Sequence, residues 1–126
     1  MLAAHFTRIP EGGDVHGFLR DFIVQNKLRR GLIIGIGGLE YAEVGYFNPV
    51  TKSYSSVVVK ADDTVVEVGS LLGNYVVDEN GNVRIHVHVS LSKPGETYSG
   101  HLIKGVAKPF LEVYLLEAEN AMEAQQ

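Results

Sequence analysis

Three histidines have the residue type and the spacing for metal chemistry. Apolar and polar residues alternate strictly over the segment 83–91, so His86 and His88 fall on one face if this segment is a strand. The two imidazoles then lie about 6.5–7 Å apart along the strand, a separation that a single metal ion bridges. The other face carries only valine, isoleucine and leucine, and we expect it to pack in the core.

A third histidine follows a predicted reversal of the chain. Pro94 and Gly95 suit the two central positions of a type II turn. If the strands pair symmetrically about this turn, His101 lies opposite His88 and shares its face. Three neutral imidazoles suit Zn²⁺ and leave a fourth position for water, as in catalytic zinc sites. The pattern therefore predicts a zinc site formed by His86, His88 and His101.

Two alternative roles for the histidines stay open from the sequence. The cluster could be a proton-transfer or anion site without metal, or the three residues could be structural histidines with ordinary hydrogen bonds. His5 and His16 have no comparable spacing, and we expect them to be surface or packing residues.

Two charged residues are candidates for roles beside the histidines. Glu67 lies in a run of valines, where a carboxylate needs either an exposed edge or a partner. It is thus either a solvated or ion-paired strand residue, or an acid or base near the site and a candidate catalytic residue. Arg84 shares the predicted face of His86 and is a candidate for binding a small anionic ligand, with a surface ion pair as the alternative.

A β-sheet has to position these side chains. The segment rich in β-branched and aromatic residues begins at Gly31, and Asn80-Gly81 predicts a hairpin that places Tyr75 opposite His86 and Gly73 opposite His88. Consecutive hairpins of this kind predict an antiparallel sheet. The expected strands are 31–39, 41–48, 53–60, 64–77, 83–91 and 110–116.

One long amphipathic helix is predicted before the sheet. Apolar residues recur at positions 15, 18, 19, 22 and 23, with Asp14 as the N-cap and an end near Arg29-Arg30-Gly31. One helix ahead of many strands predicts an α+β fold, with an antiparallel β-sheet core and the long N-terminal helix packed on it. Residues 110–116 are apolar on both faces, so we expect a second copy to cover part of the sheet.

The composition limits the class of protein. A length of 126 residues predicts a single domain, with a core over about 5–117 and a frayed tail over 118–126. The net charge of −4 argues against strong direct binding of nucleic acid. Without cysteine, any metal needs histidine or carboxylate ligands. No apolar run approaches the length of a membrane span and no signal peptide is evident, so we expect a cytoplasmic protein without a membrane partner.

The sequence contains the short motifs Glu11-Gly12-Gly13-Asp14, Ile36-Gly37-Gly38-Leu39, Glu67-x-x-Ser70-Leu71-x-Gly73, His86-x-His88 and Gly100-His101-Leu102. Together these motifs resemble the PPC (plants and prokaryotes conserved) domain family, which includes stand-alone prokaryotic members described as predicted DNA-binding proteins. The resemblance extends from end to end. It implies an α+β domain that assembles as a homotrimer, a histidine cluster similar to the zinc site of some prokaryotic members, and a fold similar to that of acetolactate decarboxylase, a three-histidine zinc enzyme.

This sequence departs from the plant members in two respects. Those members carry AT-hooks before the domain, and this chain has none. Their Gly-Arg-Phe-Glu-Ile-Leu segment aligns with residues 64–69, where only Glu67 is kept. The resemblance therefore leads first to a metal-binding homotrimer, and as alternatives to a DNA-associated regulator in which the domain provides trimerisation and partner contacts, or to an oligomeric scaffold with structural histidines.

Overall fold

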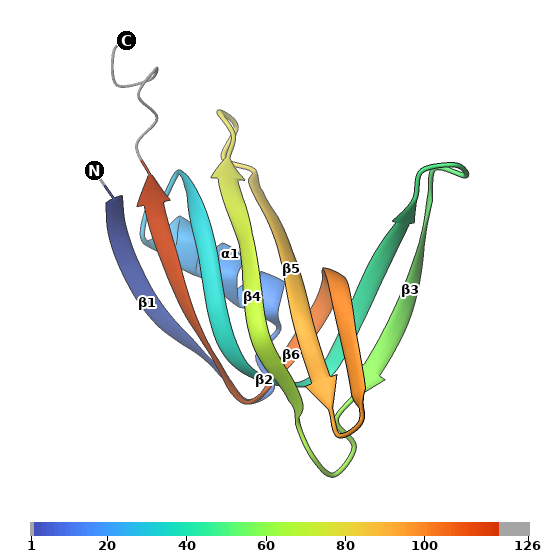
Figure 1. Cartoon of the computed structure of the whole chain (residues 1–126). Coiled ribbons are helices and arrows are strands. Elements are labelled where there is room, and N and C mark those ends of the chain that lie inside the picture. Colours follow the sequence, from blue (N-terminus) through green and yellow to red (C-terminus); the bar gives the residue numbers. More distant parts are fainter. Residues whose placement is uncertain (1, 119–126) are drawn as a thin grey trace.

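One six-stranded antiparallel sheet and one helix make up the computed structural model, which describes residues 2–118 (Figure 1). The predicted α+β fold with an antiparallel sheet is confirmed. Within the described residues, no helix has the length and the hydropathy of a membrane span. The expected tail, apart from Ala118, lies outside the described residues. The elements are β1 (Leu2–Pro10), α1 (Val15–Gln25), β2 (Arg30–Asn48), β3 (Ser53–Lys60), β4 (Val66–Val77), β5 (Val83–Lys93) and β6 (Glu96–Ala118).

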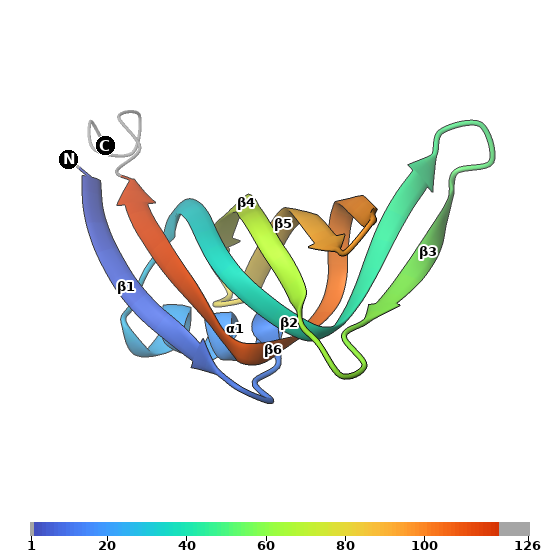
Figure 2. The same cartoon turned by 60° about the horizontal axis from the view of Figure 1, so that its bottom comes forward.

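Two long strands join the parts of the sheet. The strand order is β1-β6-β5-β4-β2-β3, and β6 also pairs with β2. Along β6, the first residues pair with β5, a long central part pairs with β2, and the last residues pair with β1. The strands curve, and the outer part of β2 forms with β3 a hairpin that extends away from the rest of the sheet (Figure 2). We call this β2–β3 hairpin, residues 41–60, the arm.

The hydrophobic core lies between α1 and one face of the sheet. Val15, Leu19 and Ile23 of α1 are fully buried, and so are Leu111 and Val113 of β6. These helix positions repeat every four residues and the strand positions every two, which are the spacings of one helix face and one strand face. The structure thus uses the apolar face that each pattern predicts.

Helix α1 is shorter than predicted. Asp14 is the N-cap, as expected, and its carboxylate accepts a hydrogen bond of 2.9 Å from the Gly17 backbone N–H. The helix ends at Gln25 because Lys27 takes a left-handed backbone conformation, with φ of 54°, which a continuing helix does not allow. Arg30 already begins β2, so the prediction of a long helix ending near residues 29–31 was wrong.

Strand β1 was not predicted, and two other strands are longer than predicted. The predicted strands 31–39 and 41–48 form the single strand β2, and the predicted strand 110–116 is only the last part of β6. The register between β2 and β4 shifts between Gly35 and Gly37, which is the site of a bulge. A bulge bends a strand without ending it, so the glycine-rich centre of β2 is a bend and not a boundary.

The loop between β4 and β5 differs from the predicted two-residue turn. Val77 and Val83 are the last paired residues, and the Asp78 carboxylate organises the loop by accepting two backbone N–H groups, from Asn80 and Asn82, each at 2.9 Å. The longer loop moves the register by one residue. The observed pairs are Asn74 with His86 and Leu72 with His88, in place of the predicted Tyr75 and Gly73.

Candidate metal centre

The structure brings three histidine side chains together on adjacent strands. His86 and His88 come from β5 and His101 from β6, and each offers a ring nitrogen within 4.8 Å of the other two. The ring centroids of His86 lie 5.1 Å from those of both His88 and His101, and the remaining pair is 5.7 Å apart. A metal ion with nitrogen ligands at about 2.0–2.1 Å fits among three nitrogens after small side-chain rotations.

The hairpin between β5 and β6 sets this geometry, as predicted. His88 pairs directly with His101, and Lys93 pairs with Glu96, so Pro94 and Gly95 are the two turn residues. Gly95 has a φ of 77°, which a type II turn requires at its second central position. The predicted position of the third histidine is therefore confirmed.

The cluster favours neutral imidazoles. Partial burial, followed by the proximity of His86 and His88, lowers the pKa of His101 below its ordinary value of 6.5. A neutral imidazole has the lone pair that a metal ion needs, so the lowered pKa favours binding near neutral pH. Within residues 2–118, no aspartate or glutamate completes this group, and the ligand set is purely imidazole.

The histidines open into a shallow depression of about 280 Å³. Its remaining lining comes largely from the arm. These residues did not emerge from the sequence, although alternation across the predicted strands 41–48 and 53–60 could have paired Phe47 with Tyr54. They are Gly45, Tyr46, Phe47, Tyr54 and Gly100.

The pairing between β2 and β6 brings the arm to the histidines. Gly45 lies directly opposite His101, and Phe47 directly opposite Tyr54. Because directly paired residues share a face, and so do residues two apart on a strand, Phe47, Tyr54 and His101 all project from the same side of the sheet. The pairing of Gly45 with His101 joins residues far apart in the sequence, and local sequence patterns do not predict it.

Glu67 does not join the histidine cluster. It is exposed on β4 and pairs with Ser92, four residues along β5 from His88, which is about 13 Å of strand. It is not among the residues that line the depression. Its role as an acid or base stays a prediction.

Arg84 lies beside the cluster but outside the depression. It is exposed on β5, two residues before His86, and pairs with Val76 of β4. Its charge acts on Asp78, where hydrogen bonds from Asn82 and a smaller effect of Arg84 lower the pKa of the carboxyl group. Both the surface ion pair and anion binding by Arg84 stay predictions.

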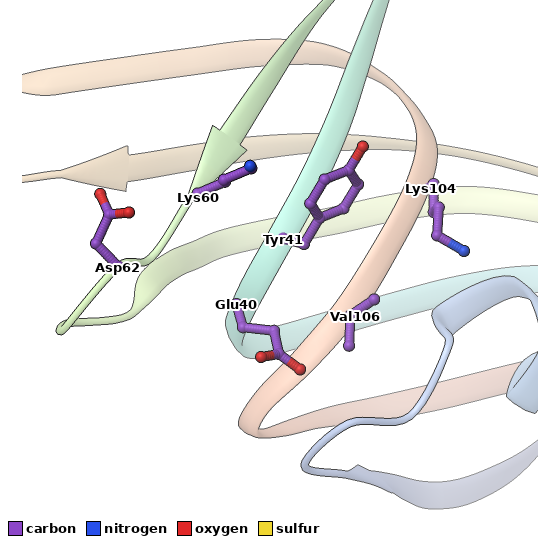
Figure 3. A pocket seen from close by; sticks show the side chains of 6 residues that line it. All are labelled: Glu40, Tyr41, Lys60, Asp62, Lys104 and Val106. Atoms are coloured by element: carbon purple, nitrogen blue, oxygen red, sulfur yellow. The ribbon is translucent and has the colours of Figure 1, made fainter.

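A second depression, of about 480 Å³, lies at the base of the arm (Figure 3). It shares no residue with the histidine site. Lys104 makes an ion pair of 3.3 Å with Asp14, so this lysine is engaged at the start of α1. Two lysines and two carboxylates balance in charge, so the depression does not select an ion of one sign. Its lining residues are Glu40, Tyr41, Lys60, Asp62, Lys104 and Val106.

The fold and the site define an α+β protein with a candidate three-histidine metal centre on the open side of its sheet. The Plants and Prokaryotes Conserved (PCC) domain, the family also abbreviated PPC, matches residues 1–119. The chain therefore belongs to this family, as the sequence motifs predicted. No functionally curated protein matches it.

Solved structures agree with this assignment. A metal-containing protein from Archaeoglobus fulgidus is 27% identical, with a TM-score of 0.81, and the match covers 91% of this chain and 79% of the other. A plant- and prokaryote-conserved protein from Pyrococcus horikoshii is 29% identical, with a TM-score of 0.82 and coverage of 95% and 83%. The α-acetolactate decarboxylase of Bacillus subtilis is 13% identical, with a TM-score of 0.63 and coverage of 92% and 52%, a similarity of fold alone.

Proposed function

We propose that this protein binds one divalent metal ion per chain, zinc by preference, through His86, His88 and His101. The observation that carries the proposal is the convergence of three ring nitrogens within 4.8 Å in an accessible depression. Three imidazoles without a thiolate or carboxylate are a ligand set that zinc accepts. The similarity to a metal-containing protein of Archaeoglobus fulgidus supports the same conclusion.

The bound ion would serve to hold a small anionic ligand. A metal with three protein ligands keeps an open position and polarises the ligand oxygen that fills it. Arg84, beside the cluster, would attract such an anion electrostatically. If the ligand is converted, Glu67 is our candidate acid or base.

We further propose that the protein is a homotrimer. A row of exposed apolar side chains crosses the sheet on the side away from α1, where directly paired residues continue from β1 through β6 and β2 to β4. Apolar side chains exposed together in this way favour coverage by another protein surface. The number three comes from the resemblance to the PPC family. The row consists of Phe6, Tyr114, Ile34 and Leu72, which are 44–56% exposed.

The test is a calorimetric titration of metal-stripped, untagged protein with zinc. We expect one site per chain in the wild type and loss of this site in the double variant His86→Ala, His88→Ala. The fold should persist because Val87 and Val89, on the opposite face of β5, make the core contacts. His5→Ala is the matched control, because His5 lies on β1 and outside the cluster.

Circular dichroism of each variant would establish that it is folded. Equal zinc affinity of the folded double variant and the wild type would contradict the proposal and favour structural histidines.

A further inference from the structure

Two aromatic side chains of the arm stand beside the histidine cluster. The rings of Phe47 and Tyr54 lie 5.1 Å apart, and the Tyr54 ring is 6.4 Å from the His101 ring. Both are exposed, Phe47 to 51% and Tyr54 to 64%. Two large exposed rings at the edge of a depression offer apolar surface that favours contact with an apolar group over contact with water.

The residue between these rings and the histidines is glycine. Gly45 pairs with His101 and is two residues before Phe47, so it occupies the position on the shared face where a side chain would stand. A Cβ atom at Gly45 would lie 2.7 Å from the Ile103 side chain, which packs over this position. The three histidines line the same depression as Phe47 and Tyr54, so a ligand held at the histidines can extend toward the arm.

The lining of the depression carries no formal charge, apart from a metal ion or a proton bound to the imidazoles. Among the described residues that form it, there is no lysine, arginine, aspartate or glutamate. A ligand that carries several charges would lose its hydration there without gaining ion pairs. Planar apolar groups, in contrast, stack on aromatic rings. The volume of about 280 Å³ limits the ligand to a small molecule.

We propose that the ligand class of this site is a small molecule with one anionic, metal-binding head and a planar apolar body that packs on Phe47 and Tyr54. This inference rests on the proposed metal site. The histidines take the head of the ligand, and the two rings of the arm select its body. Phe47 and Tyr54 are then specificity residues and not metal ligands.

Cobalt-substituted protein and two hydroxamates test this proposal. Hydroxamate binding to the cobalt ion changes its visible absorption, and benzohydroxamate differs from acetohydroxamate by a planar ring in place of a methyl group. The preference of each protein is the ratio of its two dissociation constants. We expect Tyr54→Ser to reduce the preference for benzohydroxamate by about threefold to tenfold, the range for one aromatic contact. Phe47→Ser should act in the same direction.

Val58→Ser is the matched control. Val58 is exposed to 47% on β3 and shares the face of Tyr54, but it does not line the depression. Its variant should keep the wild-type preference, and all three variants should keep the wild-type affinity for cobalt.

The outcomes separate the two proposals. Absence of cobalt binding by the wild type would overturn the metal site and this inference with it. Cobalt binding with the same hydroxamate preference in the wild type and both ring variants would overturn this inference alone.

Discussion

His16 is a partly buried histidine whose protonation opposes folding. Burial lowers its pKa below 6.5 and outweighs the opposing charge of Asp14. Arg20 and His101 lower the pKa further by smaller effects, and the Leu102 backbone opposes them. No hydrogen-bond partner for its Nδ1 atom is found among residues 2–118. The side chain is therefore held neutral on α1, next to the fully buried Val15.

Acid should destabilise the metal-free protein for this reason. Below pH 6.5 the unfolded chain binds a proton on His16 while the folded chain stays neutral there, so the free energy of unfolding falls as the pH falls from 6.5 toward the lowered pKa of the folded state. His101 contributes with the same sign. Urea unfolding at about pH 7.5 and pH 5.5 measures the effect, with a smaller pH dependence expected for His16→Leu. Equal stability of the wild type at the two pH values would contradict this expectation.

At the scale of elements, the close approach of β4 and β5 holds the histidines in place. Gly73 pairs with Val87, and a Cβ atom at Gly73 would overlap the His86 backbone carbonyl. Backbone cannot yield as a flexible side chain does. The glycine therefore allows β4 to lie against the part of β5 that carries the metal ligands.

The substitution Gly73→Ala should damage both the fold and the site. We expect a loss of about 2 kcal/mol in the free energy of unfolding, as for other overpacked positions, and weaker zinc binding because β5 shifts at His86. Thermal denaturation and zinc titration measure the two effects. Gly69→Ala on the same strand is the control, since its Cβ would meet only Ser90 O, at 3.7 Å. Similar losses in both variants would mean that strand propensity, and not the close approach, is responsible.

The parts of the site that depend on neighbouring stretches of sequence could be predicted. His86 and His88 share a face because a strand alternates, and one turn at Pro94-Gly95 brings His101 opposite. The hairpin that forms the arm could also be predicted, because its strands 41–48 and 53–60 follow each other directly in the sequence. Local periodicity and turn chemistry are sufficient for such features.

The remaining parts depend on pairings between distant segments. Strand β1 pairs only with the last residues of β6, at the other end of the sequence. No adjacent segment forms a hairpin with it, so hairpin patterns do not predict it. The approach of the arm to the site depends on the pairing of Gly45 with His101. The end of α1 depends on the backbone conformation of the single residue Lys27, and a lysine at this position does not signal the end of a helix. Sequence patterns carry little information on any of these three.

At the scale of the whole molecule, the exposed apolar row meets the histidine cluster. Ile34 pairs with Leu72, Leu72 pairs with His88, and His88 pairs with His101, so the row and the cluster lie on one face of the sheet. A second copy that covers the row would therefore lie close to the metal centre.

A charge placed in the row should prevent assembly. We expect Ile34→Asp to convert an oligomer, about three times 13.8 kDa, into monomers, because a carboxylate in an apolar interface loses its hydration. Light scattering after size exclusion gives the mass. Val24→Asp is the control, since Val24 is exposed to 59% on α1, away from the row. A wild type that is already a 13.8 kDa monomer would contradict the oligomer.

The charge of the molecule argues against direct DNA binding. Each chain carries −4, so a trimer carries three times that charge. Binding to the phosphate backbone depends on clustered cations that displace counterions. We expect no retained complex in a gel-shift assay at about 0.15 M salt with competitor DNA. A complex that survives the competitor would instead favour the DNA-associated regulator.

Strand β6 is the last strand along the chain, yet β1, β2 and β5 all pair with it. During translation, β1 through β5 are made before the strand that pairs with β1, β2 and β5. Until then, β1 has no partner and β2 pairs only with β3 and β4. Contacts between such distant segments form slowly, and strand edges that are still unpaired are prone to aggregation. The sheet can close only after residues 96–118 have been translated, so the order of the strands along the chain places its completion at the end of synthesis.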